Sequence, residues 1–170
     1  NNLFFGGIDG MTVFDPDQLL FNTQKPEVII TGFNLFYKPV NTYGDESVLK
    51  KNISETEIIE LNYDQNIIGF EFVATNLINS EKNRFKYKLE DVDKDWVDNG
   101  NSNVANYTQL QPGKYTFRVI ASNNDNVWNE EGASLKIIIH PPWWGTIWFK
   151  IIVLFNCSFS SGKNSSKLAT

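Results

Sequence analysis

The sequence predicts an all-β protein: an immunoglobulin or fibronectin-III-like antiparallel β-sandwich of about seven strands. Apolar and polar residues alternate with period two in several short segments, the pattern of a strand with one buried face and one solvated face. Turn-forming residues separate these segments at near-regular spacing, as in β-sandwiches. No segment before Pro141 shows a sustained helical period.

The alternation is clearest in segments 84–90 (RFKYKLE) and 114–122 (KYTFRVIAS), where apolar side chains fall on one face and charged side chains on the other. The other predicted strands are 28–38, 57–63, 67–75, 104–108 and 133–140. Cationic side chains on the outer faces could meet an anionic ligand, although such residues are more often solvated and protect strand edges from aggregation. They are Arg84, Lys86, Lys88, Arg118 and Lys136.

A turn and an aromatic pair sharpen the sandwich prediction. The turn-forming pair Pro112-Gly113 precedes Tyr115, and Phe117 follows two residues later. In immunoglobulin-type sandwiches a tyrosine in this place ties down the corner before its strand, two residues ahead of a cysteine. Here an aromatic residue stands where the cysteine would be, which suits a sandwich without a disulfide. The alternative is that Tyr115 is a core aromatic with its hydroxyl at the rim.

Composition narrows the function classes. The chain has 170 residues and a net charge of −5, which argues against a nucleic-acid backbone as partner. Its one cysteine, Cys157, permits no internal disulfide and no cysteine-built zinc site. The first ten residues do not read as a signal peptide, so export would need a signal upstream.

No catalytic, metal or cofactor site is expected. The single histidine, His140, lacks the serine elbow that a hydrolytic triad needs. The acidic stretch 91–95 resembles the opening of a calcium loop, but Trp96 and Ser102 stand where that loop requires glycine and glutamate. We interpret the stretch as a turn. Trp96 and Trp128, expected in polar loops, fit either lids on the sandwich ends or sugar platforms.

Three segments together resemble the triple-tyrosine (Y_Y_Y) domain found in the periplasmic sensor region of Bacteroides-type hybrid two-component histidine kinases. They are 83–98 (NRFKYKLEDVDKDWVD), 105–139 and 141–149 (PPWWGTIWF). The tyrosines that name the domain would be Tyr87, Tyr107 and Tyr115, with Trp96, Pro112 and Gly113 as further motif residues. The resemblance supplies no catalytic residues. It implies a coupling domain that receives a signal from preceding β-propellers, which bind a polysaccharide fragment mostly outside this chain.

The resemblance also implies a domain order. Residues 1–22 would be the remnant of the last propeller repeat, 23–142 the sandwich, and 143–155 the start of a truncated transmembrane helix. Trp143, Trp144 and Trp148 would lie at the membrane–water boundary. Residues 156–170 look like a non-native or disordered tail. A periplasmic, membrane-proximal location and a homodimer in the full sensor follow from the same resemblance.

A rival reading comes from a different class of protein. The same strands could form a stand-alone carbohydrate-binding module of an extracellular enzyme, with Trp96 and Trp128 as its platform. That reading requires both tryptophans to be exposed and the fragment alone to bind glycans.

Overall fold

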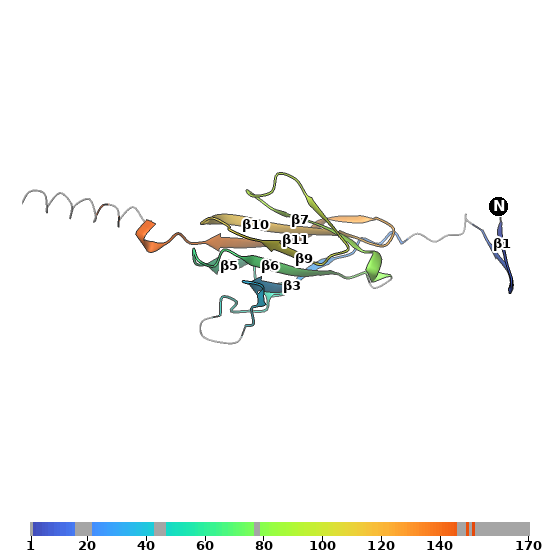
Figure 1. Cartoon of the computed structure of the whole chain (residues 1–170), viewed down its shortest axis with the longest axis horizontal. Coiled ribbons are helices and arrows are strands. Elements are labelled where there is room, and N and C mark those ends of the chain that lie inside the picture. Colours follow the sequence, from blue (N-terminus) through green and yellow to red (C-terminus); the bar gives the residue numbers. More distant parts are fainter. Residues whose placement is uncertain are drawn as a thin grey trace, which may run out of the picture.

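The computed structural model describes residues 2–15, 22–42, 47–76, 79–145, 149 and 151, and within this part of the chain the fold is all-β. A short hairpin comes first, and a two-sheet sandwich follows (Figure 1). The hairpin pairs β1 (Leu3–Gly7) with β2 (Gly10–Phe14). The sandwich strands are β3 (Val28–Leu35), β4 (Lys38–Pro39), β5 (Ile58–Leu61), β6 (Ile68–Ala74), β7 (Arg84–Leu89), β8 (Val97–Gly100), β9 (Val104–Tyr107), β10 (Gly113–Ser122) and β11 (Trp128–Ile139).

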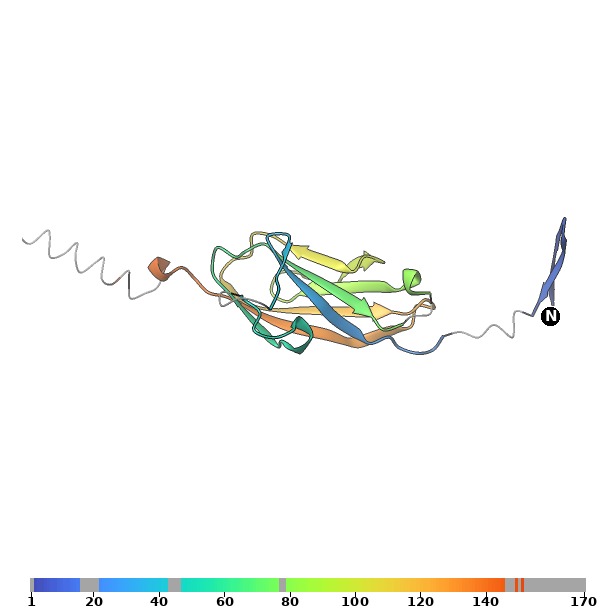
Figure 2. The same ribbon diagram turned by 90° about the horizontal axis from the view of Figure 1, so that it is seen from below.

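The predicted β-sandwich is confirmed. One sheet has five strands in the order β5-β11-β10-β7-β8, and the other has four in the order β4-β3-β6-β9. Figure 2 shows the two layers from a second direction. All seven predicted strands are present, and two short strands, β4 and β8, extend the sheets.

The sequence-based reading was wrong on two details. We expected antiparallel pairing throughout, but β5 pairs parallel with β11, with Ile59 beside Ile137. We also placed Trp128 in a loop, whereas it opens β11 and pairs with Ser122. The strand extends this far because a bulge absorbs three residues of β11 between the pairs Val119–Ala133 and Ala121–Asn129.

Gly132 makes the bulge possible. Its φ is +58°, and a Cβ placed there would lie 2.1 Å from the carbonyl oxygen of Val119. Only glycine accommodates both the left-handed backbone and this close approach. The bulge therefore depends on a single residue that alternation alone does not reveal.

Aromatic rings join the two sheets in the core. Phe70 of β6 stacks on Phe117 of β10 with 4.1 Å between ring centres, and both are fully buried. Phe72 packs against Phe85 with 5.1 Å between centres. Close packing of this kind makes the sandwich a stiff unit.

The hairpin has no such core. Every residue of β1 and β2 is exposed, and the Phe5 and Phe14 rings stack on each other. A two-stranded hairpin alone is at best marginally stable in water. Its exposed apolar side chains are Leu3, Phe4, Phe5, Met11, Val13 and Phe14, with Ile8 at the turn.

Candidate functional site: the tyrosine cluster and the two joints of the sandwich

Two of the predicted tyrosines form one cluster inside the sandwich. The rings of Tyr87 on β7 and Tyr107 on β9 meet edge to face at 5.9 Å between centres. Both also contact Phe117, at 6.2 and 6.4 Å between centres. Since β7 and β9 belong to different sheets, the cluster joins the two layers.

Asp93 holds the hydroxyl end of this cluster. Its Oδ2 accepts a hydrogen bond of 2.5 Å from the Tyr107 hydroxyl and one of 2.8 Å from the Leu89 backbone N–H. Burial and the hydrogen bond to Asp93 raise the pKa of Tyr107 far above its ordinary value. Burial also raises the pKa of Tyr87, and the Asp93 charge adds to that increase. The sequence predicts Asp93 only as part of a turn, with no role in the tyrosine cluster.

The third tyrosine, Tyr115, forms a corner. Its hydroxyl donates a 2.8 Å hydrogen bond to the backbone carbonyl of Gln111, four residues upstream. The Tyr115 ring lies against Gly113, where a Cβ would come within 3.3 Å of it. Pro112 occupies the turn between these residues. This is the geometry of a tyrosine corner.

Asn123 anchors the chain where it enters the sandwich, and we call residues 22–26 with their partners the N-terminal joint. The Asn123 side-chain amide is fully buried. It donates to the carbonyls of Asn22 (2.5 Å) and Gln24 (2.8 Å). Its oxygen accepts from the backbone N–H groups of Asp125 (2.9 Å) and Val127 (3.0 Å). One side chain therefore ties the incoming segment to the β10–β11 loop.

Further amides reinforce the same joint. Asn22 donates its backbone N–H to Asp125 at 2.6 Å, and Asn129 donates to the Pro26 carbonyl at 2.9 Å. The amide of Asn76 donates to Asn83 Oδ1 at 2.9 Å, and Asn83 donates back to the Asn76 carbonyl at 3.0 Å. Residues 16–21 lie outside the described residues, so the described part of this segment begins at Asn22. Sequence reasoning missed this network, although the run of asparagines at 122–126 (SNNDN) was its signal.

The chain leaves the sandwich at the other end, and we call residues 140–144 with their partners the exit joint. The His140 backbone N–H donates to the Leu61 carbonyl at 2.8 Å, extending the parallel β5–β11 pairing. The His140 Nε2 lies within hydrogen-bond distance of Glu60 Oε2, at 3.2 Å, and both side chains are exposed. Trp144 contacts Tyr63 edge to face at 5.0 Å between centres. The Pro141-Pro142 link therefore lies between two contacts to the β5 end.

The outer face of the five-stranded sheet carries Trp96 and Trp128. Lys86 Nζ lies 4.6 Å from the centre of the Trp128 ring, and the Arg118 guanidinium lies 5.7 Å from that of Trp96. Trp128 is half-buried and Trp96 is exposed. A cation therefore lies over one side of each ring.

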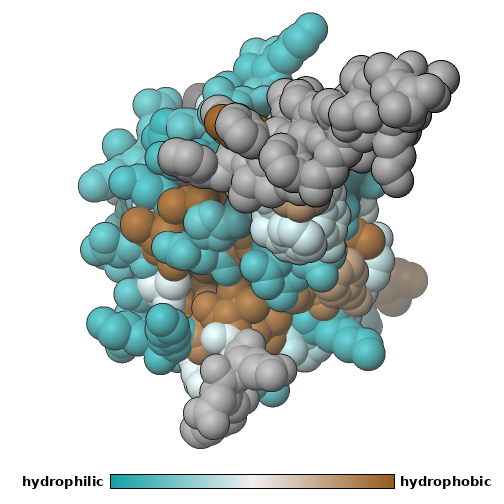
Figure 3. Space-filling view, turned by 90° about the vertical axis from the view of Figure 1, so that its left-hand side faces the viewer, coloured by the Kyte–Doolittle hydropathy of each residue, from teal (hydrophilic) through white to brown (hydrophobic). Residues whose placement is uncertain are grey.

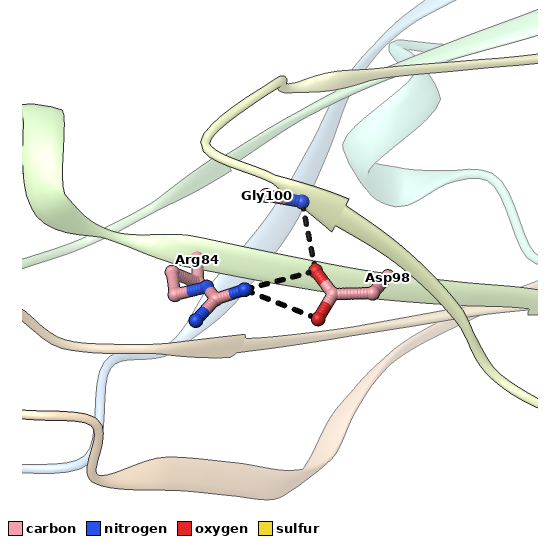
Figure 4. Close-up of polar contacts among 3 residues, drawn as sticks. All are labelled: Arg84, Asp98 and Gly100. Atoms are coloured by element: carbon pink, nitrogen blue, oxygen red, sulfur yellow. Dashed lines mark hydrogen bonds and ion pairs between the residues drawn. The ribbon is translucent and has the colours of Figure 1, made fainter.

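Exposed ion pairs complete this face. Arg84 contacts both carboxylate oxygens of Asp98, the nearer at 3.2 Å, and the Gly100 N–H donates to the same carboxylate (Figure 4). The Gly100 hydrogen bond, with a smaller contribution from Arg84, lowers the pKa of Asp98. Both side chains are half exposed, so the pair adds little stability. Arg118 lies 3.7 Å from Glu90 Oε1, so both arginines of this face are engaged with acidic partners.

The described part of the chain contains no group of three or more metal-ligating side chains. A surface groove of about 630 Å³ beside β5 is lined by charged residues of both signs, Lys50, Lys51, Glu55, Glu57 and Glu60 among them. No described helix is long and apolar enough to cross a membrane. Trp143 and Trp144 form a short 3-10 turn and are exposed. Trp148 and residues 156–170 lie outside the described residues.

Comparison with known proteins supports the resemblance drawn from the tyrosine segments. Residues 76–140 match the family model of the Y_Y_Y domain. Histidine kinase P4 of Formosa agariphila is 36% identical over 148 residues, which are 87% of this chain and 11% of that protein.

Two solved extracellular domains of Bacteroides thetaiotaomicron share the fold. Both are described as parts of hybrid two-component systems. BT4673 is 29% identical with a TM-score of 0.65, and BT3049 is 26% identical with a TM-score of 0.62. They align with 84% and 83% of this chain, and in each case with 19% of their own. The chain thus spans a small part of the proteins it matches. It contains a Y_Y_Y domain, at residues 76–140, and is related to the extracellular domains of hybrid two-component sensors.

Proposed function

We propose that this chain is the membrane-proximal, periplasmic coupling domain of a hybrid two-component sensor. It would pass a displacement from preceding β-propellers to a transmembrane helix, and so to a cytoplasmic histidine kinase. In this proposal the chain itself performs no catalysis, and the sensed polysaccharide fragment binds mainly to the propellers. Two copies would act together in the full sensor.

The observation that carries the proposal is that the chain is tied down at both ends of the sandwich. The N-terminal joint lies at the β10–β11 loop, whereas the exit joint lies at the opposite end of β11. Figure 1 shows the chain entering and leaving at opposite ends of the two-layered body. The 12 residues of β11 span roughly 40 Å between the joints at about 3.3 Å per residue.

The stiffness of the sandwich supports the proposal that a displacement passes from the N-terminal joint to the exit joint. A packed core resists compression, so a shift imposed at one joint moves the other joint instead of being absorbed. The tyrosine cluster and the Phe70–Phe117 stack hold the two sheets together. Pro141-Pro142 restricts the backbone of the exit joint.

The hairpin supports the presence of a preceding propeller. Phe5 and Phe14 lie on one of its faces, whereas Phe4 and Val13 pair on the other, and all four are exposed. A sheet that is apolar on both faces needs a covering layer on each side. Stacked blades of a propeller provide this arrangement.

Insertion of a flexible Gly-Ser segment between His140 and Trp143 of the full sensor tests the coupling role. We expect ligand-dependent kinase output to be lost while ligand affinity is unchanged, because the insertion separates the last strand from the helix. The same segment inserted at Asn101, in the exposed β8–β9 turn, is the control and should leave signalling intact. Undiminished signalling with the insertion at the exit joint would refute the proposal.

The rival carbohydrate-binding reading has its own test. Isothermal titration of this fragment with oligosaccharides should detect no binding, since the rings of Trp96 and Trp128 are each covered on one side by a cation. Measurable affinity that is lost on substitution of Trp128 would favour the binding module instead.

A further inference from the structure

Exposed aromatic side chains gather at one end of the sandwich. Among the described residues, five of the sandwich's exposed aromatics lie in the turn, the loop and the segment at the exit end: Phe36, Tyr37, Tyr63, Trp143 and Trp144. One more, Trp96, lies beside the outer sheet face under Arg118. The opposite end is occupied by the asparagine network of the N-terminal joint. The two ends of the sandwich therefore differ in chemistry.

Backbone contacts bring these segments together. The Phe36 N–H donates to the Ile67 carbonyl at 3.0 Å, which ties the β3–β4 turn to the β5–β6 loop. Tyr63 belongs to that same loop and contacts Trp144 of the exit joint. Figure 3 views the sandwich from the exit end and shows apolar surface among polar residues there.

The β3–β4 turn keeps its aromatics at a conformational cost. Phe36 has φ +51° and Tyr37 has φ +62°, and Leu35 pairs with Lys38 across them. This two-residue turn, with φ positive at both positions, is the type that Asn-Gly fits best. Bulky residues are rare in this region of φ, and strain of this kind gathers at functional sites. The Phe36 side chain is 44% exposed and the Tyr37 side chain 68% exposed, so packing of these rings does little to offset the backbone strain.

We propose that the Phe36–Tyr37 turn contacts the headgroup layer of a lipid bilayer, as a second attachment point beside the exit joint. The inference rests on the proposed membrane-proximal function. Rings with a polar tip suit the membrane–water boundary.

A bilayer is the occupant that the chain itself indicates. Trp143 and Trp144, the first residues of the apolar run 143–155 of the sequence, lie at this same end, where Trp144 contacts Tyr63. If this run enters a bilayer, as the proposed function requires, the Phe36–Tyr37 turn beside its start would face that bilayer. Because the net charge is −5, aromatic contact and not attraction to anionic lipid would dominate, and zwitterionic lipid is the suitable probe. Contact at two points would fix the tilt of the sandwich on the membrane.

Spin labelling of the whole chain tests the contact. One variant carries the label at K38C and another at E81C, in the 3-10 turn at the opposite end, both with Cys157→Ser. On phosphatidylcholine vesicles, the label at position 38 should become accessible to oxygen and shielded from a water-soluble nickel chelate. The label at position 81 should stay accessible to the chelate.

A paired substitution shows whether the aromatics cause the shielding. In the K38C background, F36N/Y37G should restore chelate access at position 38. It should not lower the melting temperature, because Asn-Gly relieves the positive-φ strain. The control I29T/V73T changes two exposed apolar residues of the four-stranded sheet and should leave the shielding intact.

Three outcomes would overturn the proposal. In the first, position 38 is as open to the chelate as position 81 on vesicles. In the second, F36N/Y37G keeps the full shielding. In the third, shielding appears equally without vesicles, which would assign the surface to a second copy of the chain. The coupling role is tested separately by the exit-joint insertion, so it survives all three of these results.

Discussion

The hydroxyl of Tyr107 donates a 2.5 Å hydrogen bond to Asp93, and this bond joins the two sheets at their polar margin. Tyr107 ends β9 of the four-stranded sheet, whereas Asp93 lies in the loop between β7 and β8 of the five-stranded sheet. Asp93 also accepts from the Leu89 N–H, so one carboxylate fixes its own loop and the opposite layer.

Removing the hydroxyl of Tyr107 should destabilise the sandwich. We expect Tyr107→Phe to lower the free energy of unfolding by about 1.5–3 kcal/mol, because a hydrogen bond to a charged group is lost in a largely buried place. Urea unfolding followed by tryptophan fluorescence measures the change. Tyr37→Phe, at an exposed tyrosine, is the matched control. Equal stability of the two variants would contradict the assigned role of the bond.

Alkaline pH should destabilise the fold through the same residue. The pKa of Tyr107 in the folded protein is raised above the ordinary value of 10.0 by burial and by Asp93. The folded phenol therefore stays protonated where the unfolded phenol ionises. The stability contribution is complete below pH 10 and decreases above it by about 1.4 kcal/mol per pH unit.

Absorbance at 295 nm during a pH titration checks this expectation. Of the six tyrosines, Tyr107 should ionise only when the protein unfolds. In Tyr107→Phe the loss of stability above pH 10 should be shallower. A phenol at position 107 that titrates near pH 10 in the folded protein would disprove the burial argument.

The Tyr115 corner should contribute less to the free energy of unfolding than the Tyr107–Asp93 hydrogen bond. Tyr115→Phe removes one neutral hydrogen bond to the Gln111 carbonyl, and we expect a loss of about 0.5–1.5 kcal/mol. Hydrogen exchange should speed up first at the amides of residues 111–115. If hydrogen exchange changed only at the far end of β10, the Tyr115 hydroxyl would not be stabilising the corner.

Asn123 should be the most sensitive polar residue of the N-terminal joint. Asn123→Ala leaves two carbonyls and two N–H groups without their partner, and we expect a loss of about 3 kcal/mol or more. Protease cleavage within residues 22–26 should accelerate as well. Asn101→Ala, at an exposed asparagine, should change neither stability nor cleavage.

Two glycines with the same backbone conformation form a matched pair. Gly132 and Gly100 have φ of +58° and +59°, but only a Cβ at Gly132 would meet another group, the Val119 carbonyl. Gly100→Ala should cost about 1–2 kcal/mol from the left-handed backbone alone. Gly132→Ala should cost clearly more, because the strand must move. Equal melting temperatures would exclude the steric argument.

Much of the fold follows from local pattern. Period-two alternation predicts β7 and β10, since a strand with one buried face must alternate. The Pro112-Gly113 turn before Tyr115 predicts the corner, because the hydrogen bond spans only four residues. The tyrosine segments also carry the resemblance to the Y_Y_Y domain, which the family match supports.

Tertiary structure alone decided the contacts between residues far apart in the chain. No local pattern reveals that Asn123 holds Asn22, 101 residues away, or that β5 pairs parallel with β11. The sequence shows that residue 132 is a glycine. Only the structure shows why a glycine is required there: the Val119 carbonyl on the neighbouring strand leaves no room for a Cβ. Period-two alternation shows which face of a strand is buried, because each side chain is selected by whether its own position is buried or solvated. Which strand end meets which loop depends on how the layers pack, and that packing places the two joints at opposite ends of one stiff body.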